Sequence, residues 1–367
     1  MAKMKKWIFV SFVLVLSAAL AACGSSGQSS GSNSPGSSPS PSATQPSGGS
    51  SPDAGQADAG GEENKSVGKR IAFFSAGASN NYLINAIEHA EKTAKELGME
   101  IDIFDGRFDA LAQFNQIQNA IATGKYDGFV VEAVDGNQVC KILTEDAVNK
   151  GIAVSAINVE LCGVTETAAP GTLTFVGGQT LGVYQEAVRQ IFTNHPEGGK
   201  IAAIAGPATG TNYKNFEKAL ELELPNFPQW QLVGMYATDY TANQAFQVAQ
   251  NVIQANRDLK VIFSNYSGMT VGVVKAKEAA KRDDILIYDF GGDEWAFEAV
   301  EKGEIQSTII MLPKEEVQRG IEALHLYFNG KEVPPFYDLT KEEILPGTMF
   351  VNKDNIEEFR ARGLPEY

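Results

Sequence analysis

A regular alternation of short apolar segments with helix-like segments constrains the fold more than any other feature of the sequence. The first half is expected to form strands at 70–75, 100–104, 129–131 and 152–157. The expected helices between them cover 82–97, 109–123 and 138–149, and glycines follow all three. Strands and helices of these lengths, joined by short loops, favour right-handed β–α–β units on a parallel sheet.

The same alternation starts again near residue 200. Strands are expected at 200–204, 231–236, 261–263 and 285–288, and helices at 215–222, 242–255 and 270–280. The two halves therefore predict an α/β protein with two doubly wound parallel-sheet lobes that face one cleft. Ligands of such sheets bind beyond the carboxyl ends of the strands, so the loops after the strands should carry the function.

Length and charge limit the possible partners. Residues 69–367 are long enough for two lobes with separate cores. The chain has a net charge of −15 and no basic cluster in this region, which argues against nucleic acid and anionic lipid surfaces as partners. No apolar run of membrane-spanning length follows residue 23.

Residues 1–23 have the features of an export signal. Three lysines precede a short apolar run that ends in Leu20-Ala21-Ala22-Cys23, and the run is too short for a spanning helix. The cysteine makes the segment resemble the lipobox of bacterial lipoproteins, which implies that Cys23 is the acylated first residue of the mature chain. An ordinary export signal with an incidental cysteine is the alternative.

Residues 24–68 are rich in Ser, Gly, Pro and Ala. Such a composition buries too little apolar surface to offset its ordering entropy, so we expect a disordered tether. Low-complexity sequence without a selected length is the alternative. With acylation at Cys23, the protein would be lipid-anchored at the outer face of the cytoplasmic membrane, or at a periplasmic membrane face, without spanning the bilayer.

Short motifs follow the expected strands in a fixed order. They are Asn80-Asn81-Tyr82, Asp105 with Asp109, Gln113 and Ile117, Tyr126-Asp127-Gly128-Phe129-Val130-Val131 with Val134-Asp135, Gly151-Ile152-Ala153-Val154 with Asn158, Thr238-Asp239-Tyr240, Phe263-Ser264-Asn265 with Met269 and Gly272, and Ser307-Thr308-Ile309 with Leu312-Pro313. In this order and spacing the body resembles the type I periplasmic-type solute-binding proteins of ABC importers, in their ribose- and galactose-like sugar-binding branch.

The resemblance implies a lobe-closing clamp without covalent chemistry or a cofactor. The N-terminal lobe would comprise 69–175 and 312–338, and the C-terminal lobe 177–310 and 340–367. Three crossings would join the lobes near 175–177, 310–312 and 338–340. The protein would be a monomer that captures a sugar or sugar-like molecule and delivers it to an ABC permease.

The resemblance also assigns ligand-binding positions. Asn80 falls at a position that binds sugar hydroxyls, and Tyr82 at that of a stacking ring, while Leu83 replaces a second ring. Asn158 stands where an aspartate usually binds the sugar, and Tyr240 matches a stacking aromatic residue.

Further positions depart from the family pattern. Phe216 falls near a family arginine but could equally belong to a helix–sheet core, and Tyr266 replaces an asparagine. The usual Gly-Phe-Asp-Gly is replaced by Asp289-Phe290-Gly291-Gly292-Asp293, so Asp289 or Asp293 could compensate. The implied site is more aromatic and less charged than a ribose site. It would suit a deoxy or partly apolar sugar, or a stacking ligand such as a nucleoside.

Cys140 and Cys162 are the cysteines of the body. In an exported protein such a pair is usually a disulfide. Both follow neighbouring expected strands, which places them at the same edge of the sheet. Two separately buried thiols are the alternative.

Enzymatic functions find little support in the sequence. His89, His195 and His325 are far apart, which argues against a zinc site or a Ser-His-Asp triad. No Gly-x4-Gly-Lys-Ser/Thr motif occurs, so ATP hydrolysis would belong to a partner. The rival functions are a receptor of the same fold that serves a sensor kinase or chemoreceptor, the effector domain of a repressor, and a hydrolase with a convergent nucleophile and base.

Overall fold

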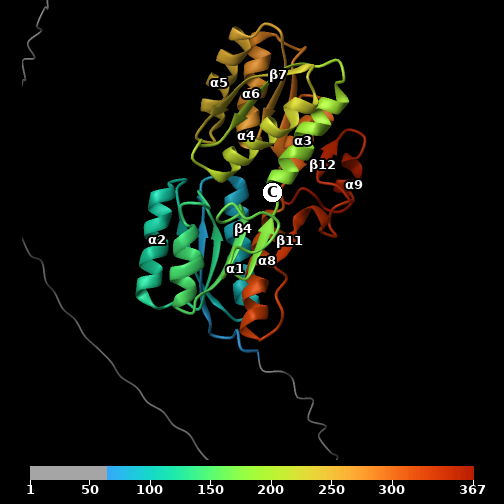
Figure 1. The fold of residues 1–367 in the computed structure, drawn as a ribbon. Helices are drawn as coiled ribbons and strands as arrows, with labels where there is room; N and C mark the ends of the chain where they lie inside the picture. The colour runs from blue at the N-terminus through green and yellow to red at the C-terminus, as the bar shows by residue number, and fades with distance from the viewer. Residues whose placement is uncertain (1–63) are drawn as a thin grey trace, which may run out of the picture. The chain divides into compact units, whose positions relative to one another are not determined.

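Two six-stranded sheets organise the part of the chain that the structure describes, which is residues 64–367 of a computed structural model (Figure 1). Each sheet is the centre of one lobe. The expected signal peptide with Cys23, and residues 24–63 of the expected tether, lie outside the described residues. Within residues 64–367, no helix is long and apolar enough to cross a membrane.

The sheet of the N-terminal lobe is entirely parallel and has the order β2-β1-β3-β4-β5-β11. Its strands are β1 (Arg70–Ser75), β2 (Glu100–Asp105), β3 (Gly128–Glu132), β4 (Ala153–Asn158), β5 (Thr174–Gly177) and β11 (Phe336–Asp338). Its helices are α1 (Asn81–Glu96), α2 (Ala110–Thr123), a segment at 140–149 with the π-helical centre η1 (Ile142–Ala147), and α8 (Pro313–Phe328).

The strands of this lobe are apolar on both faces because helices cover both. Ile71 and Phe73 pack in one core with residues of α1 and α8, whereas Ala72 and Phe74 pack in a second core with residues of α2 and the 140–149 segment. A parallel strand that is buried on both sides is a continuous apolar run. This explains why the RIAFFS segment was recognisable in the sequence.

The C-terminal lobe repeats the arrangement with the order β7-β6-β8-β9-β10-β12, and β12 is antiparallel to β10. Its strands are β6 (Gly199–Ala205), β7 (Trp230–Ala237), β8 (Leu259–Ser264), β9 (Leu286–Gly291), β10 (Ser307–Ile310) and β12 (Phe350–Asn352). Its helices are α3 (Leu181–Asn194), α4 (Thr211–Glu223), α5 (Ala242–Ala255), α6 (Ser267–Ala280), α7 (Glu294–Lys302) and α9 (Ile356–Arg360). Short 3-10 turns, η2 (Leu224–Asn226) and η3 (Leu339–Lys341), follow α4 and β11.

Side-chain caps fix where several helices begin. Asn80, Asp109, Thr180, Thr241 and Asp293 each accept a hydrogen bond from a backbone N–H of the first turn of the helix that follows. Such caps satisfy donors that have no partner within the helix. Several of these caps follow sheet strands directly, so they also fix the loops at the carboxyl edge.

The expected lobes are present, with two differences at their boundaries. The first crossing is residues 178–180, after β5, because β5 still pairs with β4 through Gly177 and Asn158. The other crossings are 311–312, between β10 and α8, and the segment between β11 and β12. In addition, residues 64–68 belong to the folded body rather than to the tether, because buried Ser66 bonds through Oγ to the Leu97 carbonyl and to His325 Nδ1.

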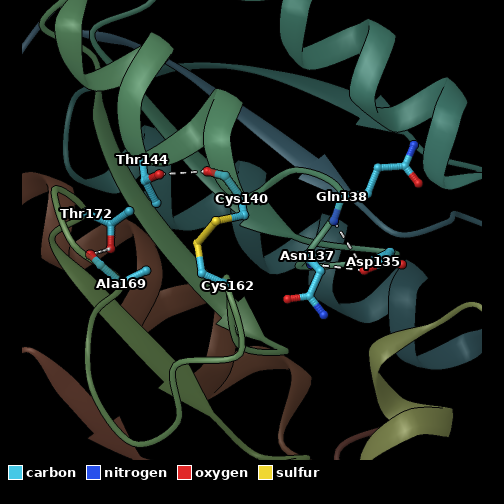
Figure 2. Close-up of a disulfide and its surroundings, with 8 residues drawn as sticks. All are labelled: Asp135, Asn137, Gln138, Cys140, Thr144, Cys162, Ala169 and Thr172. Atoms are coloured by element: carbon cyan, nitrogen blue, oxygen red, sulfur yellow. Dashed lines mark hydrogen bonds between the residues drawn. A yellow bond between two sulfur atoms is a disulfide. The ribbon is translucent and has the colours of Figure 1, made fainter.

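The 140–149 segment and the loop after β4 are covalently joined. Cys140 and Cys162 form a disulfide with a Cα–Cα distance of 5.0 Å. Figure 2 shows this bond beside the turn in which Asp135 accepts hydrogen bonds from the backbone N–H groups of Asn137 and Gln138. The disulfide therefore ties together two loops at the carboxyl edge of the N-terminal sheet.

We predict that replacing both Cys140 and Cys162 by Ala lowers the free energy of unfolding by about 3 kcal/mol, because a bond across a sequence separation of 22 restricts the unfolded chain. Urea unfolding of the wild-type protein with and without reductant measures the same effect. The double variant is the control, since reductant should leave its transition unchanged. Equal midpoints for oxidised and reduced wild-type protein would contradict this prediction.

Candidate functional site

The strand order of both sheets defines a crevice in each lobe. The order in which successive strands are added to the sheet reverses between β1 and β3 in one sheet and between β6 and β8 in the other. At such a switch point the loops after the strands diverge and leave room for a ligand. In this structure the loops of both switch points line the same space.

That space has two adjoining compartments, which we call the interlobe cavity. The first is lined by Asn80, Tyr82, Leu83, Phe108, Glu132, Gln179, Asn212, Tyr240, Asn265, Tyr266 and Met311. The second shares Phe108, Glu132, Asn212 and Tyr240 with it and adds Asn158 and Val159 among others. Each has a cavity volume of about 40 Å³, which is well below the range of typical small-molecule sites.

Aromatic rings from both lobes form the walls of the cavity. The rings of Phe108, after β2, and Tyr240, after β7, have centroids 5.0 Å apart. Tyr266, after β8, stands nearly perpendicular to Tyr240 with a centroid distance of 6.0 Å. A flat, apolar surface is thus presented to a ligand from more than one side.

Three residues that line the cavity have a left-handed backbone. The φ angles of Phe108, Asn158 and Tyr240 are 53°, 65° and 64°. Non-glycine residues rarely adopt this region, and they concentrate at functional sites when the surrounding structure holds them there. The Tyr240 ring also lies directly against Gly206, where an added Cβ would be 2.0 Å from Tyr240 Cζ. Only glycine at this position leaves room for the ring.

A buried polar network supports the N-terminal wall of the cavity. The Tyr82 hydroxyl donates to Glu316 of α8, and Asn158 Nδ2 donates to the Tyr82 hydroxyl at 2.7 Å and to Glu316 Oε2 at 3.2 Å. Burial raises the pKa of Glu316 to about 7, although its hydrogen bonds oppose that shift. The network fixes the Tyr82 ring and the Asn158 side chain relative to the sheet.

Glu132 is the last residue of β3 and lines both compartments with a side chain that is nearly inaccessible to solvent. Burial, and then the charge of Glu316, raise the pKa of Glu132 to about 8. Hydrogen bonds from the Ala76 backbone and from Ser75 Oγ, at 3.4 Å, act in the opposite direction. A proton therefore stays on this carboxyl group near neutral pH.

The two lobes are in direct contact beside the cavity. Thr211 Oγ1 accepts from the Gly136 N–H at 3.1 Å, and Asn212 Nδ2 donates to Asn158 Oδ1 at 3.3 Å. Lys214 forms an ion pair with Asp135 at 2.9 Å, and the buried Asn215 Nδ2 donates to Glu160 Oε2 at 3.1 Å. We call these four contacts, all made by the first turns of α4, the interlobe latch. They join the two lobes directly beside the cavity.

Six of the sequence-predicted residues line the interlobe cavity. They are Asn80, Tyr82, Leu83, Asn158, Tyr240 and Tyr266. Asn80 has a second role, because its Oδ1 accepts from the Leu83 N–H at 2.9 Å and caps α1. The hydrogen-bonding groups of Asn158 are engaged by the protein itself, as described above.

The structure places three other sequence-predicted residues away from the cavity lining. Phe216 is fully buried in the core, with ring centroids 5.3 Å from Tyr184 and 4.7 Å from Phe263. This corresponds to the core alternative and corrects its assignment as a ligand residue. The side chain points from α4 onto the sheet, which is the usual place for a large apolar residue.

The two acids near the end of β9 also have structural partners. Asp289 is buried and accepts hydrogen bonds from Ser267 at 2.8 Å, from Thr308 at 2.5 Å and from Thr270. It borders a different, larger hollow of about 470 Å³ in the C-terminal lobe, away from both switch points. Asp293 accepts from the Ala296 N–H at 2.9 Å and caps α7. Neither lines the interlobe cavity.

Several residues that line the cavity were not predicted as ligand positions from the sequence, namely Phe108, Glu132, Gln179, Asn212, Asn265 and Met311. The sequence did contain a signal for Glu132, because an acidic residue at the end of a wholly buried strand is unusual and indicates a structural or functional role. The amides carry no such signal in a sequence rich in polar loop residues. Within residues 64–367, no group of three or more His, Cys, Asp or Glu is placed to hold a metal ion.

Comparison with known proteins agrees with this geometry. A family profile described as periplasmic binding protein domain matches residues 71–332. The chain belongs to the periplasmic binding protein family. It is 21% identical over 260 residues to the ribose import binding protein of Bacillus subtilis, covering 70% of this chain and 80% of that one. It is 24% identical over 265 residues to the D-allose-binding periplasmic protein of Escherichia coli, with 70% and 84% covered.

Solved structures confirm the fold. An ABC transporter solute-binding protein of Agrobacterium vitis with bound allitol superposes with a TM-score of 0.70 at 20% identity, covering 81% of this chain and 99% of that one. The two-lobed type I fold expected from the sequence is therefore confirmed. The family consists of binding proteins, so the chain is not an enzyme, and membership implies a location outside the cytoplasm.

We predict that Glu132→Gln changes the pH dependence of stability. The pKa of Glu132 rises from 4.5 to about 8 on folding, so the folded chain retains a proton that the unfolded chain has lost. The stability associated with this group is full below pH 4.5 and is lost as the pH rises to about 8. The variant should therefore exceed the wild type by about 1 kcal/mol or more at pH 8, and by less at pH 5.

Urea unfolding at pH 5 and pH 8 measures this difference. Glu217→Gln on the exposed face of α4 is the control and should follow the wild-type pH dependence. A difference between Glu132→Gln and the wild type that stays constant from pH 5 to pH 8 would refute the prediction.

Proposed function

We propose that the chain is an extracytoplasmic solute receptor that closes its lobes on a sugar or sugar-like molecule and delivers it to an ABC importer. The observation that carries this proposal is the interlobe cavity, in which aromatic rings and side-chain amides alternate. A sugar has apolar C–H faces, which rings can cover, and a rim of hydroxyl groups that donate and accept hydrogen bonds.

The amides of the cavity are suited to this rim. Asn212 Oδ1 and Asn265 Oδ1 are buried and have no hydrogen-bond partner among residues 64–367. A buried polar atom without a partner costs about 1–3 kcal/mol, so a ligand hydroxyl that donates to it would recover that energy. Gln179 on the first crossing also lines the cavity, and its Oε1 and Asn265 Nδ2 both bond to the Tyr184 hydroxyl.

The relatives support the same ligand class. The Bacillus subtilis protein is named for ribose import, and the Agrobacterium vitis structure contains allitol. A sugar and an open-chain polyol share the pattern of adjacent hydroxyl groups that the amides would recognise. Membership of an importer family supports delivery to a permease.

The crossings supply the mechanism of closure. Gln179 on the first crossing donates from Nε2 to Met311 Sδ on the second at 3.2 Å, and both residues line the cavity. Rotation about these segments would open the cavity and separate the interlobe latch. Ligand contacts with both lobes would then favour the closed arrangement over the open one. Lipid anchoring through Cys23 would keep the receptor near its permease.

We predict that at least one pentose, hexose or polyol raises the melting temperature of residues 64–367 by several degrees, as a saturating ligand of the folded state should. A thermal-shift screen of pentoses, hexoses, polyols and nucleosides measures this. Shifts by nucleosides alone would overturn the sugar assignment and leave the receptor assignment standing. A protein unaffected by every compound would overturn the proposed function.

We further predict that Tyr240→Ala weakens binding of the compound found in that screen about tenfold or more, because a stacking ring of the wall is lost. The unfolding transition should change little, since Tyr240 is a loop residue. Isothermal titration calorimetry measures the affinity, with Tyr327→Ala on the exposed surface of α8 as the matched control. Equal affinities for the two variants would remove Tyr240 from the site.

A further inference from the structure

We infer that the ligand carries a positively charged nitrogen besides its hydroxyl groups, as an amino sugar or an aminopolyol does, and that Glu132 is the counterion of this nitrogen. This inference rests on the proposed function and narrows its ligand class. It starts from the charge of the interlobe cavity.

The lining of the cavity contains one carboxyl group and no basic side chain. Among the residues that line the two compartments, Glu132 is the acid, and none is Lys, Arg or His. The basic residue nearest the cavity mouth among the latch contacts, Lys214, is already paired with Asp135. A ligand with a carboxylate or phosphate would find no cation here, whereas a cationic ligand finds an acid.

Glu132 also lacks a counterion within the part of the chain that the structure describes. Its hydrogen bonds come from the Ser75 hydroxyl and the Ala76 backbone, which are neutral. In the described residues it forms no ion pair, and the nearest ionisable groups on the elements around it are Glu316, Tyr82 and Tyr240. Burying a carboxylate without a cation is costly, so the group either keeps a proton or pairs with a charge that the ligand brings.

The aromatic walls suit the same ligand. Phe108 and Tyr240 line both compartments together with Glu132, and Tyr82 and Tyr266 complete the first. An ammonium group is attracted to the faces of such rings, and the attraction grows when water is excluded. Rings and a carboxylate around one space are the combination that an organic cation requires.

An independent observation comes from Asn265 on the opposite lobe. Its side chain is 1% exposed, lines the first compartment, and has an Oδ1 atom without a partner. Asn212 Oδ1 is likewise unpaired. The C-terminal lobe therefore offers two buried acceptors in addition to Glu132 of the N-terminal lobe, which match a donor-rich ligand with N–H and O–H groups.

Cation binding should be coupled to proton release from Glu132. Near pH 7 this carboxyl group carries a proton, since its pKa is about 8, and the facing groups Glu316, Tyr82 and Tyr240 add no positive charge. A bound ammonium would favour the carboxylate and expel that proton. The affinity for a ligand that stays protonated should thus rise from pH 6 to pH 8, by up to about tenfold per pH unit.

The test compares matched pairs that differ in one amino group, namely sorbitol with 1-amino-1-deoxysorbitol, glucose with glucosamine, and galactose with galactosamine. Calorimetric titrations of the wild type, Glu132→Gln and the surface control Glu217→Gln are run at pH 6, 7 and 8. We expect at least one amino compound to bind about tenfold or more tightly than its partner at pH 7. Glu132→Gln should abolish that preference, and Glu217→Gln should retain it.

A measurement on the wild type alone still tests the inference if the variant folds poorly. Titration of the preferred amino compound at pH 7 in two buffers of different ionisation enthalpy should show release of close to one proton per ligand. Preference for the neutral compounds, or an amino preference that Glu132→Gln leaves intact, would overturn the inference while the proposed function stands. Absence of binding by every compound of both kinds would overturn both.

Discussion

Parallel strand pairing with an early reversal of strand order is the constraint on which the rest of the structure depends. In each lobe the second strand lies outside the first and the third lies on its other side. All loops that follow the strands then emerge at one edge and diverge at one point. Because both lobes have this order, ring, amide and acid residues from distant parts of the sequence, such as Phe108 and Tyr266, line a single cavity.

The walls of that cavity are chemically unequal. The N-terminal wall contains Glu132 and the network of Tyr82, Asn158 and Glu316. Burial raises the pKa of both acids, and the charge of Glu316 raises that of Glu132 further. The C-terminal wall offers amides and tyrosine rings. In the proposed function, a ligand that contacts both walls would meet an acid on one side and neutral acceptors on the other. Closure would therefore select the ligand by its hydrogen-bonding and charged groups as well as by its shape.

Closure also involves contacts outside the cavity. The interlobe latch joins α4 to the loops after β3 and β4, and the Cys140–Cys162 disulfide ties those two loops together. At the side of the crossings, Tyr367 packs against Tyr82 of one lobe and donates to the Gly291 carbonyl of the other at 2.6 Å, near the point marked C in Figure 1. These contacts therefore join the lobes outside the cavity.

The sequence by itself determined the α/β class, the two doubly wound lobes and the edge that carries the site, because buried strands and amphipathic helices have periodicities that local pattern reveals. Six of the residues that line the cavity, including Asn80 and Tyr240, are positions that the family resemblance implied. Tertiary structure alone decided that Phe216 faces a core and that Asp289 accepts hydrogen bonds from buried hydroxyl groups. It also decided that Glu132, Asn212 and Asn265 line the same cavity. Those facts depend on the directions of side chains and on approaches between segments far apart in the chain, and no local pattern encodes either.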